Sequence, residues 1–177
     1  AQRLAENGPD RGVVVGDEQR LGPEGQGWKV ALTVLASERL DSGGLGLDNA
    51  DRAVEMARHR STPLDALEVD RVADLVTRAY VQRLTGIRVA AAVVAGQDPG
   101  AEASVGKLLA TDTMARTSEV ARLLLGPDLT VDSGRWGEHA WLEHVLGAPG
   151  YRIAGGTDEI QHNILAERVL GLPREPA

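Results

Sequence analysis

Two long segments with apolar residues at helical spacing most constrain the fold of this 177-residue chain. The first runs from Leu64 to Ala95 and the second from Glu102 to Leu125, with a short connection, Gly96 to Gly100, between them. In both segments apolar residues recur three and four positions apart, which is the period of an amphipathic helix. Long helices joined by short loops pack antiparallel, so the segments predict a helical bundle.

The apolar periodicity also predicts which side chains lie in the core. In the first segment these are Leu67, Val72, Leu75, Val76, Tyr80, Leu84, Ile87 and Ala91. In the second segment they are Val105, Leu108, Leu109, Val120 and Leu124. Further helices are predicted over 28–41, from Leu47 or Asp48 to His59, and over 136–146, with Gly147 to Gly150 as a connection. The expected fold class is therefore all-α.

A short β-branched run, Val13 to Val15, lies between glycines near the start of the chain and predicts one strand. A single strand cannot form a sheet, so its partners are expected outside this chain. We therefore expect residues 1–22 to be a lead-in with the last strand of a β-domain, and residues 23–177 to form the helical bundle. The chain is expected to be the C-terminal part of a larger architecture.

Composition excludes several classes of function. The net charge of −7 argues against a nucleic-acid or anionic-membrane surface, and the absence of cysteine excludes disulfides and thiol nucleophiles. No apolar run reaches the roughly 18 residues that a bilayer span needs, and the polar first ten residues are unlike a signal peptide. These features predict a cytoplasmic protein.

The stretch from Tyr151 to Pro176 combines a glycine turn with a well-delimited helix. Gly155 and Gly156 precede Thr157, which is placed to cap the helix, and Gly171 and Pro173 stop it. One interpretation is simply a capped terminal helix. The alternative is a binding turn, because free backbone amides at a glycine-rich helix start suit a phosphate, a carbonyl or the edge of a flavin.

Glu38 is the candidate for acid–base chemistry. It falls on the same helical face as Ala31, Val34 and Leu35, so a carboxylate stands on an apolar stripe. Burial there would raise its pKa toward the range of a useful general base. The alternative is that Glu38 lies at the solvent edge, where its helix ends, and pairs with a neighbour.

Other candidate motifs are weak. Ser104 and Lys107 match a Ser-x-x-Lys pattern, but no partner motif follows, so we expect ordinary helix surface. The four histidines do not have metal-ligand spacing; His139 and His144, for example, are five residues apart. They are expected at the surface or as satisfied side chains, and no metal site is predicted.

Two segments resemble the signatures of the acyl-CoA dehydrogenase family. The C-terminal one is the stretch from Tyr151 to Pro176, and the N-terminal one is Gly22-Pro-Glu-Gly-Gln-Gly-Trp28 with the helix through Ser37-Glu38-Arg39-Leu40. Together they bracket nearly the whole chain. The resemblance implies the family's C-terminal helical domain, preceded by the end of its middle β-domain.

The resemblance also implies a reaction: a glutamate takes the α-proton of an acyl-CoA thioester while the β-hydride passes to FAD. Most members carry that glutamate immediately before the Gly-Thr of the C-terminal signature, where this chain has Gly155. A minority carry it on the first C-terminal helix, just before an arginine, which here means Glu38 followed by Arg39. Glu38 is thus the candidate catalytic base and Arg39 the candidate substrate-binding residue.

The resemblance implies that Gly156, Thr157 and Glu159 contact FAD. Two further family motifs contact FAD across a subunit interface, and both are altered here. The Arg-x-x-Phe-Gly region has neither Phe nor Gly, with Arg58 or Arg60 as candidate replacements, and the Gln-x-x-Gly-Gly region has Leu123 and Pro127 instead of Gln and the second Gly. Such changes resemble subunits of the mixed tetramers that act on steroid-type or bulky thioesters.

Two functional hypotheses follow. The first is the C-terminal part of an FAD-dependent acyl-CoA dehydrogenase, inactive as an isolated segment, with an electron-transfer flavoprotein as acceptor. The second is a non-catalytic subunit or scaffold of the same fold that completes a partner's FAD site in a mixed oligomer. The resemblance also implies a homo- or hetero-tetramer. The role of Glu38 separates the two hypotheses, because only the first needs it as a proton acceptor.

Overall fold

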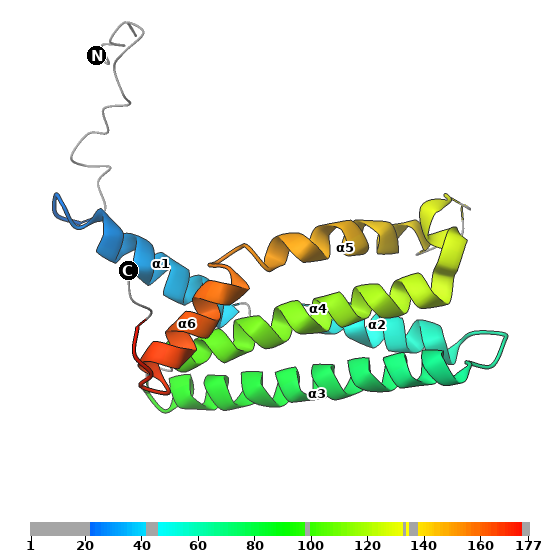
Figure 1. The fold of residues 1–177 in the computed structure, drawn as a ribbon, viewed down its shortest axis with the longest axis horizontal. Coiled ribbons are helices and arrows are strands. Elements are labelled where there is room, and N and C mark those ends of the chain that lie inside the picture. Colours follow the sequence, from blue (N-terminus) through cyan, green and yellow to red (C-terminus); the bar gives the residue numbers. More distant parts are fainter. Residues whose placement is uncertain (1–21, 42–45, 98–99, 133, 135–137, 175–177) are drawn as a thin grey trace, which may run out of the picture. The chain divides into compact units, whose positions relative to one another are not determined.

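The computed structural model describes residues 22–41, 46–97, 100–132, 134 and 138–174, which form helices joined by turns and contain no strand. The chain divides into two compact units, Ala1–Val34 and Leu35–Ala177. The described part of the first unit is a turn that leads into the start of α1, and the second unit contains the bundle (Figure 1). The all-α fold class is confirmed.

Most helices begin and end close to the predicted residues. The elements are α1 (Gly27–Asp41), α2 (Leu47–Arg58), α3 (Ala66–Val94), a 3₁₀ turn (Gly100–Glu102), α4 (Ala103–Leu125), a second 3₁₀ turn (Gly126–Thr130), α5 (Glu138–Tyr151) and α6 (Asp158–Arg168). The predicted strand over 13–15 lies outside the described residues. The boundary expected near residue 22 stays a prediction.

Helix α4 is the centre of the bundle: it contacts α2, α3, α5 and α6. Figure 1 shows α3 and α5 on opposite sides of α4, and α6 crossing one end. Because α4 is surrounded, its buried residues extend beyond one apolar stripe and are mostly small or polar. Of the predicted α4 core, Val120 is buried, while Val105, Leu108, Leu109 and Leu124 are half-buried.

Small side chains build the core where α2, α3 and α4 meet. Its buried residues are Ala50, Ala53, Leu75, Ala79 and Val120, with Trp141 of α5 among the side chains packed against it. Alanines let helix backbones approach closely, which explains how a chain without phenylalanine fills its interior.

The capping of α3 is strong. The Asp65 carboxylate accepts from the backbone amide of Glu68 at 2.9 Å, and the Glu68 carboxylate accepts from the amide of Asp65 at 2.9 Å. This reciprocal capping box satisfies two backbone donors that the first turn of a helix otherwise leaves free. It explains why the helix begins at Ala66 and not at Leu64.

The prediction of which α3 residues lie in the core is mostly wrong. Leu75 is fully buried and Val72 half-buried, but the other six predicted core residues of α3 are exposed. The helix buries only the face turned toward α2 and α4. Its opposite face carries a second apolar series that helical periodicity alone does not distinguish from the first.

Ion pairs join α3 to α4 along their contact. Arg116 of α4 lies 3.3 Å from Asp74 of α3, Arg78 lies 3.3 Å from Asp112, and Arg71 lies 3.2 Å from Glu119. These side chains are about a third exposed, so each pair adds little alone, but the interlocked network favours one register of the two helices.

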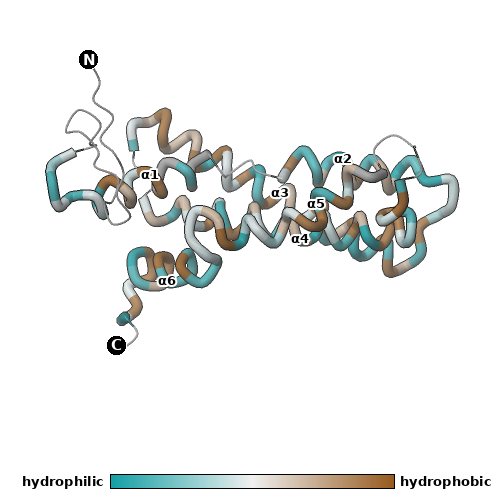
Figure 2. The backbone as a smooth tube through the Cα atoms, turned by 90° about the horizontal axis from the view of Figure 1, so that it is seen from above, coloured by the Kyte–Doolittle hydropathy of each residue, from teal (hydrophilic) through white to brown (hydrophobic). Residues whose placement is uncertain are grey.

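Helix α5 runs further than predicted, through the expected connection Gly147 to Gly150, and ends at Tyr151. Pro149 lies inside its last turn and has no N–H to donate. Ala148 is only 5% exposed, and this packing stabilises a helical turn that local sequence disfavours. In Figure 2 hydrophobic and hydrophilic segments alternate along the helices. No helix among the described residues is long and apolar enough to cross a bilayer.

Candidate functional site at the start of helix α6

A glycine turn precedes α6 and has a backbone shape that few other residues adopt. Gly155 has φ +65° and Gly156 has φ +100°. The buried side chain of Gln161 donates from Nε2 to the carbonyls of both glycines, at 3.2 Å each. Thr157 then caps the helix, as predicted, by accepting from the amide of Ile160 at 3.3 Å. The turn is thus held in one conformation by the helix that it starts.

A buried ion pair anchors this turn to α4. The Asp158 carboxylate accepts from Lys107 Nζ at 3.1 Å, from Arg152 Nε at 2.6 Å and from Thr111 Oγ1 at 3.3 Å. Lys107 Nζ also donates to the Arg152 carbonyl at 3.2 Å, so both ends of the turn are bound to the same α4 side chain. The side chains of Lys107 and Asp158 are 5% and 11% exposed.

Two basic side chains keep the Asp158 carboxylate ionised. Burial favours the neutral form of Asp158, but hydrogen bonds from Arg152 and Lys107, with the attraction of their charges, outweigh it and hold the pKa of Asp158 below its ordinary value. The carboxylate therefore stays ionised. Arg152 is correspondingly held charged, because its hydrogen bond to Asp158 raises the pKa of its guanidinium.

The expectation that Ser104 and Lys107 form ordinary helix surface is wrong. Ser104 is 1% exposed and Lys107 4% exposed, because they lie on the side of α4 that is covered by other elements. A lone lysine in an amphipathic segment is normally solvated, so the sequence did not indicate that Lys107 is buried. Its partner Asp158 follows 51 positions later.

Glu38 lies directly against the glycine turn. A Cβ atom built on Gly155 would stand 3.3 Å from Glu38 Oε1 and 3.4 Å from its carboxyl carbon. The structure therefore brings the two alternative positions of the catalytic glutamate, far apart in the sequence, to the same point in space. The absence of a side chain at Gly155 leaves room for the Glu38 carboxylate.

The predicted burial of Glu38 is wrong in this structure. Its side chain is exposed, like that of Val34, while Leu35 is half-buried. Glu38 stands one turn before the end of α1 at Asp41, which agrees with the solvent-edge alternative. Its position over Gly155, and not an apolar environment within the chain, is what makes it a candidate. Arg39 belongs to the same turn of α1, but its side chain lies outside the described residues.

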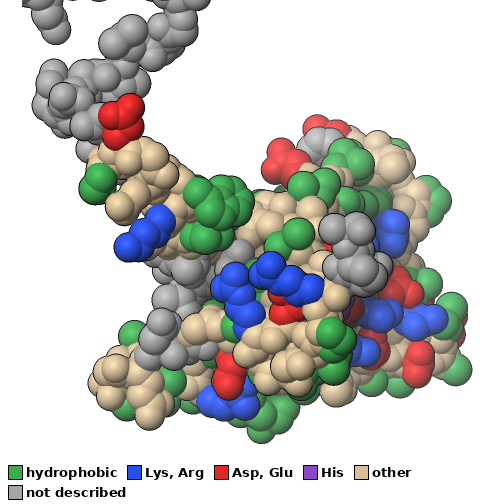
Figure 3. Space-filling view, turned by 60° about the vertical axis from the view of Figure 1, so that its left-hand side comes forward, with side chains coloured by type: hydrophobic (Ala, Val, Ile, Leu, Met, Phe, Trp, Pro, Cys, Tyr) green, Lys and Arg blue, Asp and Glu red, His purple; other side chains and the backbone are tan. Residues whose placement is uncertain are grey.

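The predicted cofactor-side residues cluster at the same turn. Gly156 and Thr157 are half-buried, and Glu159 is exposed. The Glu159 carboxylate hydrogen-bonds to Thr157, which lowers the pKa of Glu159. Figure 3 brings the α6 end forward and shows basic and acidic side chains intermixed on this face.

The turn suits one part of FAD better than another. Two glycines without Cβ atoms allow a planar ring edge or a carbonyl to approach the backbone closely. A phosphate fits less well, because the Glu159 carboxylate already stands at the start of α6. The geometry of the turn therefore suits the uncharged flavin end of FAD better than its phosphates.

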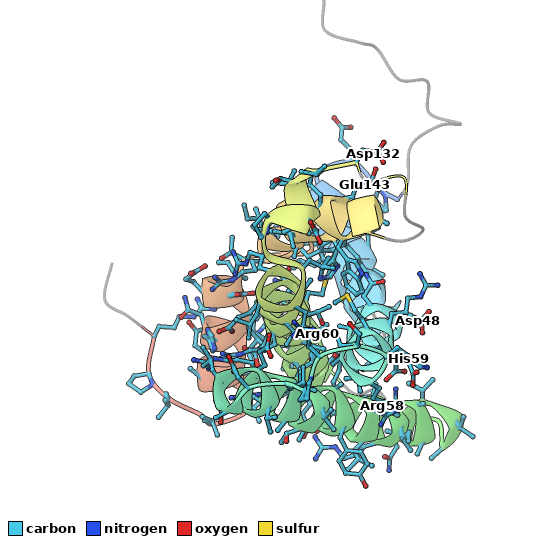
Figure 4. The ribbon with its side chains drawn as sticks, turned by 90° about the vertical axis from the view of Figure 1, so that its right-hand side faces the viewer. Asp48, Arg58, His59, Arg60, Asp132 and Glu143 are labelled. Atoms are coloured by element: carbon cyan, nitrogen blue, oxygen red, sulfur yellow. The ribbon has the colours of Figure 1, made fainter. Side chains whose placement is uncertain are left out.

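The ends of α2 and α4 do not fit a diphosphate. Arg60 is bound to Glu68 at 2.5 Å and so serves the cap of α3, while Arg58 pairs with Glu55 at 2.9 Å. Figure 4 labels Arg58 and Arg60 at the place where α2 ends. Leu123 has no polar side-chain atom, and Pro127 has no N–H. In the two regions where the family motifs are altered, the side chains are therefore either paired with other residues or unable to donate a hydrogen bond.

A cavity of about 910 Å³ between α2, α4 and α5 is a feature that sequence reasoning missed. It is lined mainly by apolar groups such as Met56, Met114 and Trp141, with His144 among the polar residues. His144 Nε2 donates to the Met114 carbonyl at 3.2 Å, and its Nδ1 accepts from the Asn49 amide at 3.0 Å. These two bonds require a neutral ring, which confirms that His144 is a satisfied side chain.

We expect His144 to make stability depend on pH. Burial lowers the pKa of His144, partly offset by the bond to Met114, so the unfolded chain binds the proton more tightly. The resulting stabilisation is complete above the unfolded pKa of about 6.5 and is lost as pH falls through the folded value. The melting temperature should therefore be lower at about pH 5.5 than at about pH 7.5, with a part of the difference that comes from His144.

The control for this prediction is a pair of glutamine variants. His144→Gln keeps a donor and an acceptor without titrating, so the part of the slope due to His144 should disappear. His162→Gln, at an exposed position, is the matched control for the substitution itself. Equal slopes in wild type and His144→Gln would contradict the assignment.

No group of three or more possible metal ligands is present among the described residues. That the protein has no metal site stays a prediction.

Comparison with known proteins agrees with this architecture. The family model for the acyl-CoA dehydrogenase C-terminal domain matches residues 25–170. The chain is 34% identical over 163 residues to acyl-CoA dehydrogenase FadE34 of Mycobacterium tuberculosis, covering 92% of this chain and 22% of that protein. It is 34% identical over 162 residues to acyl-CoA dehydrogenase IpdE1 of Mycolicibacterium smegmatis, covering 88% and 39%.

Solved structures show the same fold. Butyryl-CoA dehydrogenase from Megasphaera elsdenii matches with a TM-score of 0.69 at 23% identity, covering 88% of this chain and 42% of that one. PigA with FAD and proline matches with a TM-score of 0.72 at 25% identity, covering 90% and 43%. The chain thus spans less than half the length of these relatives. The chain has a helical architecture and two signature segments, and the family model matches residues 25–170. It therefore belongs to the acyl-CoA dehydrogenase family and carries its C-terminal domain.

Proposed function

We propose that this chain is the helical part of an FAD-dependent enzyme that introduces an α,β double bond into an acyl-CoA thioester, with Glu38 as the base. The observation that supports this most is the position of the Glu38 carboxylate over Gly155, 3.3 Å from where a Cβ would stand. Glycine suits this position because of its backbone shape, φ +65°, and a Cβ there would make the Glu38 carboxylate shift by a few tenths of an ångström.

The chemistry assigned to the chain is a proton transfer. A Glu38 carboxylate oxygen takes the α-proton of the thioester, and the electrons of that C–H bond form the α,β double bond as a hydride leaves the β-carbon. FAD, when bound, supplies the acceptor for that hydride. Arg39, the next residue, is proposed to contact the substrate.

The glycine turn is proposed to position the flavin end of the cofactor through Gly156, Thr157 and Glu159. For this the turn must not move, and the Asp158–Lys107 ion pair and the Gln161 hydrogen bonds hold its two ends. Rigid placement matters because base and hydride acceptor must both lie within reach of adjacent carbon atoms.

The direct test is flavin reduction by substrate. The intact protein that contains this chain, isolated with its flavin and any partner subunit, is mixed anaerobically with saturated acyl-CoA thioesters of different chain length and branching. At least one should bleach the visible flavin band and yield a product lighter by two hydrogens. The matching thioether, in which CH₂ replaces the thioester carbonyl, should not bleach it, because its α-proton is not acidic. Unchanged flavin with every thioester would refute the proposal.

A second candidate is a non-catalytic subunit that completes a partner's FAD site through its α6 turn. It is favoured by the α2 and α4 ends, where Arg60 is engaged with Glu68 and Pro127 replaces a possible donor. In that case flavin would appear only when the chain is purified with its partner, and turnover would not depend on Glu38.

The wider assignments stay predictions. These are an acyl-CoA substrate, a homo- or hetero-tetramer, an electron-transfer flavoprotein as acceptor and a cytoplasmic location. The isolated 177-residue chain is expected to show no dye-linked turnover, because it spans less than half the length of its dehydrogenase relatives.

A further inference from the structure

The cavity between α2, α4 and α5 is lined by sulfur and aromatic side chains. Both methionines of the chain, Met56 and Met114, line it together with Trp141 and Tyr151. The whole chain has only two methionines, three tryptophans, two tyrosines and no phenylalanine, so these residue types are concentrated here. Methionine fills irregular apolar space and makes favourable contacts between its sulfur and aromatic rings. The composition of the wall therefore indicates a site for an aromatic molecule.

Neighbouring groups hold two of these side chains in place. Met114 is 4% exposed, and a Cβ built on Gly46 would lie 2.6 Å from its Cγ, so the absence of a side chain at Gly46 leaves room for it. Trp141 makes an edge-to-face contact with His144, with ring centroids 5.8 Å apart and planes at 85°. A wall that is ordered before binding loses little conformational freedom when a ligand enters. Met56, which is half-buried, is the side chain that can adapt.

The half-buried polar groups of the lining already have partners within the chain. His144 is bonded to the Asn49 amide and to the Met114 carbonyl, and its ring is neutral. These groups therefore do not need a hydrogen bond from a ligand. A charged group placed against the apolar wall would lose its water without gaining a partner. The part of a ligand that enters the cavity is therefore expected to be apolar.

Charged residues of the lining stand where the cavity meets solvent. Arg52 on α2 and Glu143 on α5 are both exposed, and neither forms an ion pair with another residue that the structure describes. Glu55, also in the lining, is engaged with Arg58 and His59. One unpaired charge of each sign, on two different walls, favours a ligand without net charge.

We infer that this cavity binds an apolar aromatic molecule of no net charge, with its rings against the two methionines and Trp141. The cavity volume of about 910 Å³ lies within the range of roughly 300–1,000 Å³ that small-molecule sites have. Other elements form it than α1 with Glu38 and the glycine turn, so the inference does not depend on the proposed dehydrogenation. The nucleotide end of FAD is not the occupant, because the ends of α2 and α4 do not fit a diphosphate.

Methionine methyl signals test binding directly. In the intact protein that contains this chain, labelled with ¹³C at its methionine methyl groups, the signals of Met56 and Met114 are assigned through Met56→Leu and Met114→Leu. The neutral probe 2-naphthol should shift both signals through its ring current. By calorimetry, the anionic 2-naphthoate and the cationic 2-naphthylmethylammonium should bind at least about tenfold more weakly, because each loses its hydration. Decahydro-2-naphthol, which has no aromatic ring, should bind about fivefold more weakly.

Three results of this titration would overturn the inference. The first is that 2-naphthol shifts neither methionine signal. The second is that a charged or the saturated probe binds as tightly as 2-naphthol. The third is that ADP displaces 2-naphthol, which would identify the cavity as a nucleotide site.

Filling the cavity tests its location. Gly147 lines the cavity, and a Cβ built there would meet no atom within 4 Å, so Gly147→Leu adds a side chain at the wall without a clash at its base. Gly150, on the same helix, has equally free surroundings but does not line the cavity, which makes Gly150→Leu the matched control. Neither glycine has a positive φ, so circular dichroism should show unchanged helix content in both variants.

The two variants should differ in binding. Gly147→Leu should weaken the binding of 2-naphthol at least about tenfold, because its side chain occupies space that the rings need, and Gly150→Leu should leave it unchanged. Equal affinity of the wild-type protein and Gly147→Leu would place the rings elsewhere and contradict the site.

Discussion

Replacing Glu38 with glutamine is expected to reduce turnover of the flavin-bound protein roughly 1,000-fold, since a positioned proton acceptor contributes about 10²–10⁴-fold. Glutamine has nearly the same shape but cannot take the α-proton. Flavin content, helix content and thioester binding should therefore be retained. The measurement is the rate of flavin bleaching by a thioester that reduces the wild-type protein.

A matched control for this variant is Glu143→Gln, another exposed glutamate, which stands on α5. It should leave bleaching unchanged. If Glu38→Gln bleaches as fast as wild type, Glu38 is not the base, and the reading as a non-catalytic subunit gains support. If flavin is lost from Glu38→Gln, the variant reports on cofactor binding instead, which would also contradict the assigned role.

Relocating the carboxylate provides a stricter test. A side chain on Gly155 would begin 3.3 Å from the present Glu38 Oε1, so Gly155→Glu in a Glu38→Gln background returns a carboxylate to the same region. The cost is a left-handed backbone at φ +65°, about 1–2 kcal/mol for a residue with a Cβ. We expect partial recovery, about tenfold or more above Glu38→Gln alone. A control with Gly155→Gln should show none.

Loss of the buried Asp158 carboxylate is expected to have the largest effect on stability. Asp158→Ala removes the counter-ion of Lys107, whose side chain is 5% exposed and lies too deep to reach water without rearrangement. Breaking one partner of a buried pair costs about 3–5 kcal/mol, because the remaining charge has no compensation. Denaturant unfolding should show this as a lower midpoint at unchanged slope.

Two further variants separate the pair from its surroundings. Lys107→Met/Asp158→Leu removes both charges and should cost less than the sum of the single variants, because no unpaired charge remains. Glu55→Ala breaks an exposed pair with Arg58, where side chains are 55% and 68% exposed, and should change stability by less than about 0.5 kcal/mol. Additive losses in the double variant would contradict an interaction between Lys107 and Asp158.

The direction of the pH effect follows from the lowered pKa of Asp158. Its stabilisation is complete above the unfolded value of about 3.9 and is lost as pH falls through the folded value. The difference in unfolding free energy between wild type and Asp158→Asn should therefore shrink in acid and stay constant above about pH 5. A difference that grows in acid would contradict the assignment.

Local signals were sufficient for the helices and their limits. The spacing of apolar residues, the Thr157 cap and the stop at Gly171 are properties of short segments, and the structure has α6 from Asp158 to Arg168. Local rules failed at α5, where packing of Ala148 holds a helical turn through Gly147 and Pro149. Propensity is worth only a few kcal/mol, so burial can override it.

The helical class, the family signatures and the glycine turn before α6 can all be predicted from the sequence alone. The three-dimensional packing was needed to show which of two apolar faces of α3 is buried, that Lys107 is the buried partner of Asp158, and that Glu38 stands exposed over Gly155. The physical reason is the range of the forces. Backbone hydrogen bonds and caps act within one turn of chain, whereas burial and ion pairing depend on which distant segment α4 brings alongside.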